Sequence, residues 1–530
     1  MKLIRTAIIA AAALSAFNST AVIDNPITLA VLKVYDAQLK QNPQDYMTWY
    51  KRANEYYRHS EYIRALDDVN NALAYAPSGD TDTRFQAYML RAGIYNQTGR
   101  HDQALADLNS AVALDGDSYA AIYQRANTEF ELGDYPAARI DYTRLQRLNS
   151  RSTEALLGLA RCSVKENNLS AANDLLQQAV EFDVNNPEIY VRRASVRRMM
   201  GDHNGAVDDL VLAISLKSDD PKAIEHLVEY GNTNYPAVIA GLTNAIQLAP
   251  ENGLYRYLRA SIAQAHYNYL SAIDDFQYII DNNLYNYHGL HGSIARCLLG
   301  LGRYEEALAE IDLALGTVDN VADYYIIRSQ ILRAMGRSDD AINAAARALA
   351  VDPNYAPGLV EMALNYIDKN QYDQASGLLG EATMSKADDP SILLLRAWMH
   401  QNFLNQPVAA RGFNEQILDI DAYEPDNIRS LRGFALLSLG REEEADSWMK
   451  RVLEMNADPD GYNNYLGACY YSLRGEEDKA LDCAERSLQA GYSDNHNWMQ
   501  NTDGPVNAGI LRDDLRFLRL MQKYNSIFVK

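Results

Sequence analysis

A small residue recurs along this chain at a nearly fixed interval, and that recurrence constrains the fold more than any other feature. The step is 34 residues between successive members of Ala104, Ala138, Ala172 and Ala206, and it is 34 again over Ala307, Ala341 and Ala375. The same place is occupied by further alanines at Ala65, Ala272, Ala445 and Ala480. A period of this length is typical of stacked helical hairpins.

Residues 118–152 show what one copy contains. Ala126 and Ala138 are small residues at places where two helices could touch, and Gly133 between them predicts a helix end followed by a turn. We expect three residues to give the second helix its apolar face: Tyr135, Ile140 and Tyr142. A hairpin with so little apolar surface needs copies of itself on both sides.

The copies can be counted from the spacing of the alanines. The 66 residues between Ala206 and Ala272 leave room for one shortened repeat, and the 70 between Ala375 and Ala445 leave room for one lengthened repeat. The chain is therefore expected to contain about thirteen hairpins.

The first copy carries the residues of a known repeat pattern, with Arg52 and Val69 where Leu and an aromatic residue are usual. The matching residues are Trp49, Ala53, Tyr56, Ala65, Ala72 and Pro77. From about residue 44 to residue 490 the chain resembles the tetratricopeptide-repeat (TPR) family. The resemblance implies an all-α solenoid, a right-handed superhelix of helical hairpins whose first helices line a concave face that holds ligands.

On this basis the chain is expected to consist of consecutive segments. We expect an N-terminal capping half-repeat at 22–43, repeats one to five at 44–219, a divergent short repeat at 220–250, repeats seven to thirteen at 251–490 and a C-terminal capping segment at 491–530. The last segment carries an apolar stripe at helical spacing, Leu511, Leu515, Leu518 and Met521. A partner-binding helix is the alternative for this stripe.

Residues 1–21 have the features of an export signal. Lys2 and Arg5 precede an apolar run over residues 7–17, and small residues lie just before Val22. The run is too short to span a bilayer, although a retained N-terminal anchor is the alternative. We therefore expect an exported protein of a bacterial periplasm or cell envelope, associated with a membrane only through such an anchor or through a partner.

Five repeats contain an Arg in the first helix and an Asp sixteen residues later in the second. They are Arg52 and Asp68, Arg91 and Asp107, Arg125 and Asp141, Arg193 and Asp209, and Arg259 and Asp275. The fourth repeat replaces both members together, with Leu159 and Leu175. This joint replacement predicts that each pair forms a salt bridge between the two helices of its hairpin. An Arg that only extends over the groove into water is the alternative.

The sequence offers no arrangement typical of catalysis. It contains no phosphate-binding glycine loop and no nucleophile-elbow motif, so we expect no enzyme activity and no cofactor. His288 and His291 lack a Cys or acidic neighbour at helical spacing, which favours a surface feature over a metal site. Cys469 and Cys483 lie on the two helices of one hairpin, where a disulfide is one alternative and two free thiols the other.

Partner binding is the remaining function. The family resemblance places these residues on the concave face: Tyr50, Asn54, Tyr57, Arg58, Met89, Asn96, Tyr123, Asn127, Phe130, Arg161 and Lys165. Aromatic side chains supply rigid contact area and Asn can bond a peptide backbone, although packing between repeats is an equal alternative for the aromatic residues. Such a face suits an extended peptide or an amphipathic helix.

The formal net charge of −21 disfavours nucleic acid and anionic lipid, which both need clustered Lys and Arg. We therefore expect a non-enzymatic scaffold or adaptor for other proteins, with no nucleic-acid partner and no metal. Recognition of a glycan or another non-protein ligand is an alternative, as is a non-catalytic subunit of an envelope enzyme or secretion complex.

Overall fold

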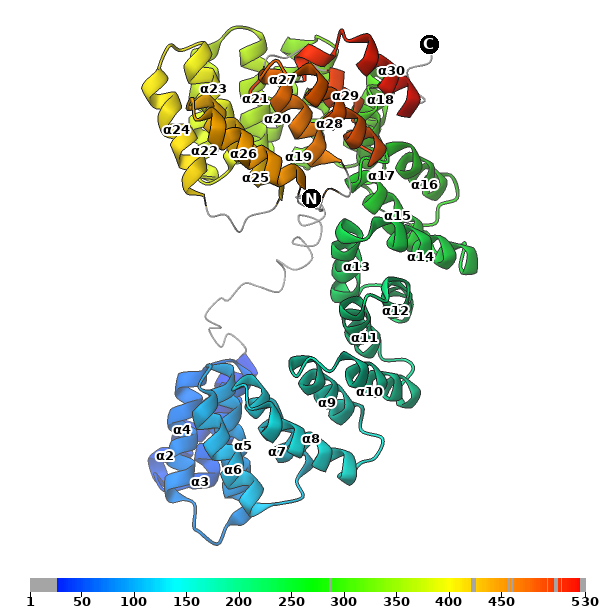
Figure 1. Cartoon of the computed structure of the whole chain (residues 1–530). Coiled ribbons are helices and arrows are strands. Elements are labelled where there is room, and N and C mark those ends of the chain that lie inside the picture. Colours follow the sequence, from blue (N-terminus) through cyan, green and yellow to red (C-terminus); the bar gives the residue numbers. More distant parts are fainter. Residues whose placement is uncertain are drawn as a thin grey trace. The chain divides into compact units, whose positions relative to one another are not determined.

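The structure is a computed structural model of the 530-residue chain (Figure 1). It describes residues 26–285, 287–420, 426–454, 458, 461–492, 494–499, 504–506 and 508–524. The predicted export signal lies outside these residues. Every regular element in the described part is a helix, so the all-α prediction is confirmed.

The chain divides into two compact units, one up to Leu227 and the other from Val228. The boundary falls within helix α13 (Pro221–Thr233), in the segment for which the sequence predicts a divergent repeat. Each unit is described by itself.

In the first unit a single helix, α2 (Pro26–Gln41), packs on α3 and precedes a series of helix pairs. The pairs are α3 (Tyr46–Arg58) with α4 (Tyr62–Tyr75), α5 (Thr81–Gln97) with α6 (His101–Leu114), α7 (Tyr119–Glu131) with α8 (Tyr135–Leu148), α9 (Thr153–Lys165) with α10 (Leu169–Phe182), and α11 (Pro187–Met200) with α12 (His203–Leu216).

The second unit continues the series and ends in three short elements. Its helices are α14 (Tyr235–Leu248), α15 (Gly253–Ala265), α16 (Tyr269–Asp281), α17 (Leu290–Gly300), α18 (Tyr304–Thr317), α19 (Ala322–Ala334), α20 (Ser338–Val351), α21 (Ala356–Asp368), α22 (Tyr372–Ser385), α23 (Pro390–Asn402), α24 (Pro407–Asp419), α25 (Asp426–Ser438), α26 (Glu442–Glu454), α27 (Tyr462–Leu473), α28 (Glu477–Gln489), α29 (Asn495–Met499), η1 (Gly509–Leu511) and α30 (Leu515–Tyr524). The helices from α3 to α28 number 26, which corresponds to the thirteen hairpins expected from the alanine spacing.

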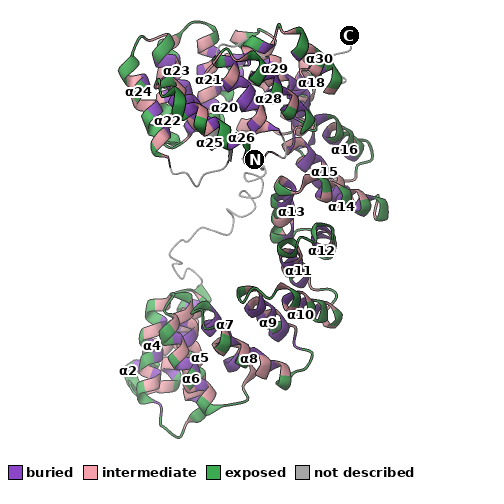
Figure 2. Cartoon of the chain, viewed as in Figure 1, coloured by how far each residue is buried: buried purple, intermediate pink, exposed green. Residues whose placement is uncertain are grey.

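The recurring alanines all lie where helices meet. Each is at most 1% exposed, so none has room for a larger side chain without displacing a neighbour. Figure 2 shows buried residues running through both units along the stacked helices. Between α7 and α8, Gly133 takes the left-handed conformation with φ 83°, and the Asp134 side chain then caps α8 by accepting from the Ala137 amide.

One part of the expected apolar face of α8 is wrong. Tyr142 is fully buried, but Ile140 is 70% exposed. Residues two apart on a helix point in different directions, so Tyr142 and Ile140 cannot share a face. The buried face of α8 instead continues from Tyr142 to Leu145.

All five Arg and Asp pairs singled out in the sequence are ion pairs in the structure. In each pair the Arg Nε and Nη2 donate to the two carboxylate oxygens, at 2.5 to 2.9 Å. Arg193 and Asp209 are the most buried, with side chains 7% and 1% exposed. The hydrogen bond with Asp68 raises the pKa of Arg52, so this guanidinium keeps its charge.

The third guanidinium nitrogen reaches the preceding hairpin, which the sequence did not predict. Nη1 of Arg125 donates to Asn109, 16 residues earlier in α6, at 3.1 Å. The equivalent acceptors of the other four arginines also lie on the preceding helix in the stack, which is the single helix α2 for Arg52 and a second helix for the rest: Asp36, Asn70, Gln177 and Thr243. Each Arg therefore ties together three helices: its own, the second helix of its hairpin and the helix that precedes the hairpin.

Repeats without the Arg and Asp pair join their helices through other contacts. Leu159 and Leu175 belong to one apolar cluster, so both polar members are replaced by packing. Arg396 and Arg432, which have no Asp opposite, lie over aromatic rings, Phe413 at 4.0 Å and Trp448 at 5.0 Å. Arg328 keeps only the backward contact, with Asp312 at 2.8 Å.

The end of the chain packs on the last hairpin, because η1 contacts α27 and α28 and α30 contacts α28. The predicted stripe is partly wrong: Leu511 and Met521 are buried, but Leu515 is 69% exposed. Phe517, four residues before Met521, is buried in its place. Cys469 and Cys483 are buried free thiols, so the disulfide alternative is wrong.

A test of the Arg and Asp pairing uses Asp107→Ala. We expect a loss of about 1–3 kcal/mol in stability, because Arg91 would keep a half-buried charge without its carboxylate. The double variant Arg91→Leu with Asp107→Leu, which copies the fourth repeat, should recover most of that loss. Urea unfolding followed by circular dichroism measures both, and a double variant no more stable than Asp107→Ala would contradict the pairing.

A second test compares two helical glycines. A Cβ at Gly158 would lie 2.3 Å from the Tyr142 ring, whereas a Cβ at Gly377 has nothing within 4 Å. We expect Gly158→Ala to lower the melting temperature, since overpacking costs about 1–3 kcal/mol. Gly377→Ala should raise it through a helix-propensity gain of up to about 1 kcal/mol. Calorimetric melting of both variants checks the signs, and equal shifts would show that the close approach of α8 and α9 is unimportant.

Candidate functional site

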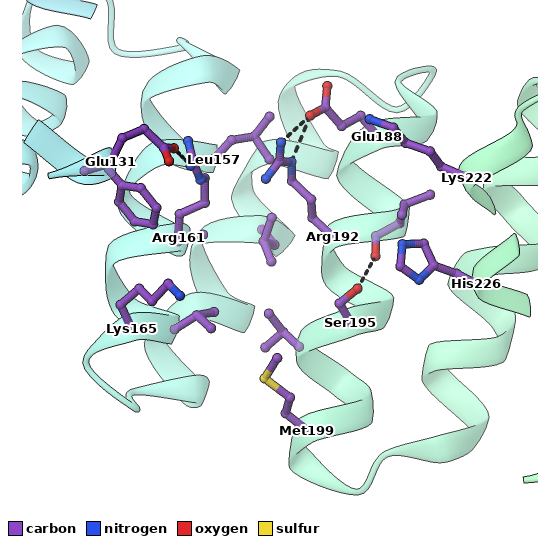
Figure 3. Close-up of a pocket in the computed structure, with 16 residues that line it drawn as sticks. Glu131, Leu157, Arg161, Lys165, Glu188, Arg192, Ser195, Met199, Lys222 and His226 are labelled. Carbon is purple, nitrogen blue, oxygen red and sulfur yellow. Dashed lines mark hydrogen bonds and ion pairs between the residues drawn. The ribbon is translucent and has the colours of Figure 1, made fainter. Parts of the chain in front are cut away.

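A groove of about 500 Å³ lies in the first unit along successive first helices (Figure 3). Its lining comes from the end of α7, from α9 and α11, and from the first part of α13, with Leu176 of α10 behind them. Because it follows one helix per hairpin, the groove is a product of the repeat itself.

The floor of the groove is apolar because the helix period places apolar residues of α9 and α11 on one face each. In α9 these are Leu157, Ala160 and Val164, with spacings of three and four residues. In α11 the corresponding residues are Val191 and Met199. Met199 is 55% exposed, so the floor is accessible from solvent.

The rim of the groove is basic, although the whole chain is strongly acidic. It carries Arg161, Lys165, Arg192 and Lys222. Two glutamates also line the groove, and each is already paired: Glu131 with Arg161 at 2.9 Å and Glu188 with Arg192 at 2.5 Å. Lys165 and Lys222 are exposed and make no salt bridge to any described residue, so their charges are directed to solvent.

Three of the predicted partner-binding residues meet at one end of the groove. The Arg161 guanidinium lies 4.0 Å from the centre of the Phe130 ring, and its Nη1 donates to Asn127 Oδ1 at 3.4 Å. The same Asn127 oxygen accepts from the Tyr142 hydroxyl at 2.7 Å. Lys165 lies one turn further along α9. This corner is therefore fixed before any ligand arrives.

Other predicted residues serve contacts between repeats instead. Tyr50 and Tyr57 pack against the apolar cluster of the first two hairpins, and Met89 and Tyr123 pack against the next two clusters. The Asn96 amide donates to Thr128 at 2.9 Å, which links α5 to α7. The three tyrosines thus make the packing contacts of that alternative, and Met89 and Asn96 also make contacts between repeats.

The two remaining predicted residues lie on the first hairpin, outside the groove. Asn54 is half-buried on α3. Arg58 is exposed and donates to Glu55 at 3.3 Å.

The sequence analysis did not extend the predicted binding residues to α11, the first helix of the next hairpin. Adding the 34-residue period to Leu157, Arg161 and Lys165 gives Val191, Ser195 and Met199, which all line the groove. The signal was thus present in the sequence. Lys222 and His226 of α13 follow at a spacing of four residues, but they lie in the divergent repeat, where the alignment of copies is lost.

The histidine pair in the second unit is used for contacts with neighbouring helices. His288 Nδ1 lies 3.2 Å from the Tyr324 hydroxyl, and His291 Nδ1 lies 2.7 Å from the Glu310 carboxylate. Among the residues that the structure describes, no three His, Cys, Asp or Glu side chains gather as a metal site would require. In the same part of the chain, none of the helices has the length and apolarity to cross a membrane.

Comparison with protein families gives matches to tetratricopeptide-repeat models along both units. The matched residues are 50–119, 130–193, 332–399 and 428–459. Repeats of this kind are typically non-catalytic and bind other proteins.

Among characterised proteins, the chain is 22% identical over 339 residues to mouse (Mus musculus) DnaJ homolog subfamily C member 3, covering 58% of this chain and 61% of that protein. It is 23% identical over 357 residues to human (Homo sapiens) Tetratricopeptide repeat protein 6, covering 64% and 68%. The chain thus spans less than two thirds of the mouse relative.

Among solved structures, yeast Tom70 is 14% identical and has a TM-score of 0.37, covering 77% of this chain and 97% of that one. A tetratricopeptide repeat protein from Parabacteroides merdae is 18% identical with a TM-score of 0.33, covering 48% and 99%. The helix pairs, the 34-residue period and the family matches agree with one another. The chain is therefore a tetratricopeptide-repeat protein, an all-helical solenoid of the kind that binds other proteins.

Proposed function

We propose that this protein is exported to a bacterial cell envelope and acts there as a non-enzymatic scaffold that holds a peptide or helical segment of another protein in the α7–α13 groove. The groove carries the proposal, because it combines an accessible apolar floor with a basic rim on successive first helices. Its length along four hairpins suits an extended peptide or a single amphipathic helix.

The charges of the groove favour an acidic partner segment. The rim has four Lys and Arg against two glutamates, in a chain whose net charge is −21. The positive charges of the rim attract an acidic ligand to the groove, and the acidic surface around it repels the ligand elsewhere. Apolar side chains of the same segment would cover Leu157, Val191 and Met199.

A photo-crosslinking residue at Met199 in living cells tests the groove. We expect it to capture a defined protein partner. The same residue at Leu212, which is 46% exposed on the second helix α12, should not capture it. Lys165→Glu with Lys222→Glu should reduce the Met199 crosslink at least about tenfold, since removing two favourable charges and adding two unfavourable ones costs more than 1.4 kcal/mol.

Lys217→Glu is the control for charge outside the groove lining, because it makes one of the same Lys→Glu changes in the same unit. Equal capture at Met199 and Leu212, or equal loss with Lys217→Glu, would argue against the groove as the binding site.

Export has its own test, which does not depend on the groove. Residues 1–21 support it through their basic start and short apolar run. We expect the protein in the envelope fraction of its host to begin at Val22, as measured by N-terminal sequencing. A protein that keeps Met1 and fractionates with membranes would favour the anchor alternative, and one found in the cytoplasm would contradict export.

A further inference from the structure

Near its end the chain comes back to the beginning of the second unit. Tyr492 and residues 494–499, here named the return segment, follow the last hairpin, and α29 within it contacts α17. In a repeat array each hairpin is expected to contact its neighbours only. This contact joins residues about 200 positions apart and therefore needs its own explanation.

Two tyrosine hydroxyls hold the return segment. Tyr269, the first residue of α16, donates to Asp494 Oδ2 at 3.2 Å. Tyr304, the first residue of α18, lies with its hydroxyl 3.1 Å from His496 Nδ1. Together with Tyr267 they form the turn edge, the surface where first helices end and second helices begin.

Tyr267 adds an aromatic contact to these polar ones. Its ring centre lies 4.4 Å from that of Tyr492 and 6.3 Å from that of Tyr462, to which it is nearly parallel at 10°. Tyr269 and Asp494, which share the hydrogen bond, are both buried. The turn edge thus offers the return segment both an apolar and a polar contact.

The backbone of Tyr267 is strained. It takes φ 57°, in the left-handed region that bulky residues avoid. Where the equivalent place, two residues before a second helix, takes positive φ in other hairpins, it holds small or amide residues: Ser60, Gly99, Gly133, Asn167, Gly201, Gly302, Gly336, Asn370, Asn405, Gly440 and Gly475. A tyrosine here strains the backbone, and the surrounding contacts must offset that strain.

The tyrosines that begin other second helices find partners close by. Tyr62 packs on Tyr57, Tyr135 on Phe130, and Tyr372 stacks on Phe403. Tyr269 and Tyr304 differ, since their hydroxyl contacts are 225 and 192 residues away. At Tyr269 and Tyr304, the first position of the second helix therefore contacts the return segment instead of a neighbouring residue of the array.

We propose that the turn edge of α15–α18 is a recognition surface for an aromatic and acidic peptide segment, and that its occupant is the chain's own return segment. The second unit is therefore closed by an internal ligand, and this surface is covered while the α7–α13 groove of the first unit stays open.

The chemistry of Asp494 fits a recognised residue. Besides Tyr269, it accepts hydrogen bonds from the Asn497 amide at 2.9 Å and the Asn497 side chain at 3.1 Å. Burial raises the pKa of Asp494 to about 6, against the effect of these bonds. A carboxyl group this buried stays in place only because the Tyr269 hydroxyl and the Asn497 donors are fixed around it.

The test is a matched pair of double variants in the full chain. Tyr267→Gly with Tyr269→Phe removes the aromatic contact and one hydroxyl at the α15–α16 turn. Asn370→Gly with Tyr372→Phe introduces the same two residues at the equivalent places of the α21–α22 turn, whose hydrogen bonds and ring contacts among the described residues do not include the return segment. Native-state hydrogen exchange follows the amides of Asn497 and Trp498, which bond to Asp494.

We expect the first variant to exchange at these two amides at least about tenfold faster than wild type, and the control to stay within about twofold. Indistinguishable rates in the two variants would overturn the proposal. Amides of α23 report opening of the whole unit. If they also exchange faster, Tyr304→Phe alone decides: it must accelerate Asn497 and Trp498 without affecting α23, and failure to do so overturns the proposal.

Discussion

The arginine that bridges three helices is the interaction on which the array depends. A single hairpin buries too little apolar surface to be stable alone, so every hairpin must be joined to the next one. The recurring alanines allow neighbouring helices to approach closely. The Arg guanidinium then fixes this arrangement, because two of its nitrogens bind the Asp of its own hairpin and the third binds the preceding hairpin. Where the pair is missing, leucines or an arginine over an aromatic ring perform the same joining role.

The same repeat gives rise to two different surfaces. In the first unit, the exposed face of the first helices forms a groove whose residues follow directly from the 34-residue period. In the second unit, the ends of the first helices and the starts of the second carry tyrosines that contact the end of the chain. Binding capacity therefore resides at surface positions of the repeat, while buried positions maintain the stack.

The sequence was sufficient to predict the helices, their number and the five salt bridges, because all of these are local and recur at a fixed period. Phe130 and Arg161, which the family resemblance assigns to the concave face, line the groove of the structure. It could not separate Tyr57 and Asn96 from ligand-binding residues, since packing on the next hairpin and binding a peptide require the same residue types. It missed the backward contact of each arginine, because the acceptor changes between Asp, Asn, Gln and Thr from copy to copy. It missed the return segment because those contacts join residues about 200 positions apart.

The return segment also limits how this protein can change in evolution. Repeat arrays ordinarily gain or lose hairpins without harm, since each copy needs only its neighbours. Between Tyr269 and Asp494 that freedom is absent, because duplicating or deleting one hairpin would move the end of the chain away from its tyrosines. Homologues that keep the return segment should vary in the number of hairpins before α15 and keep that number constant after it.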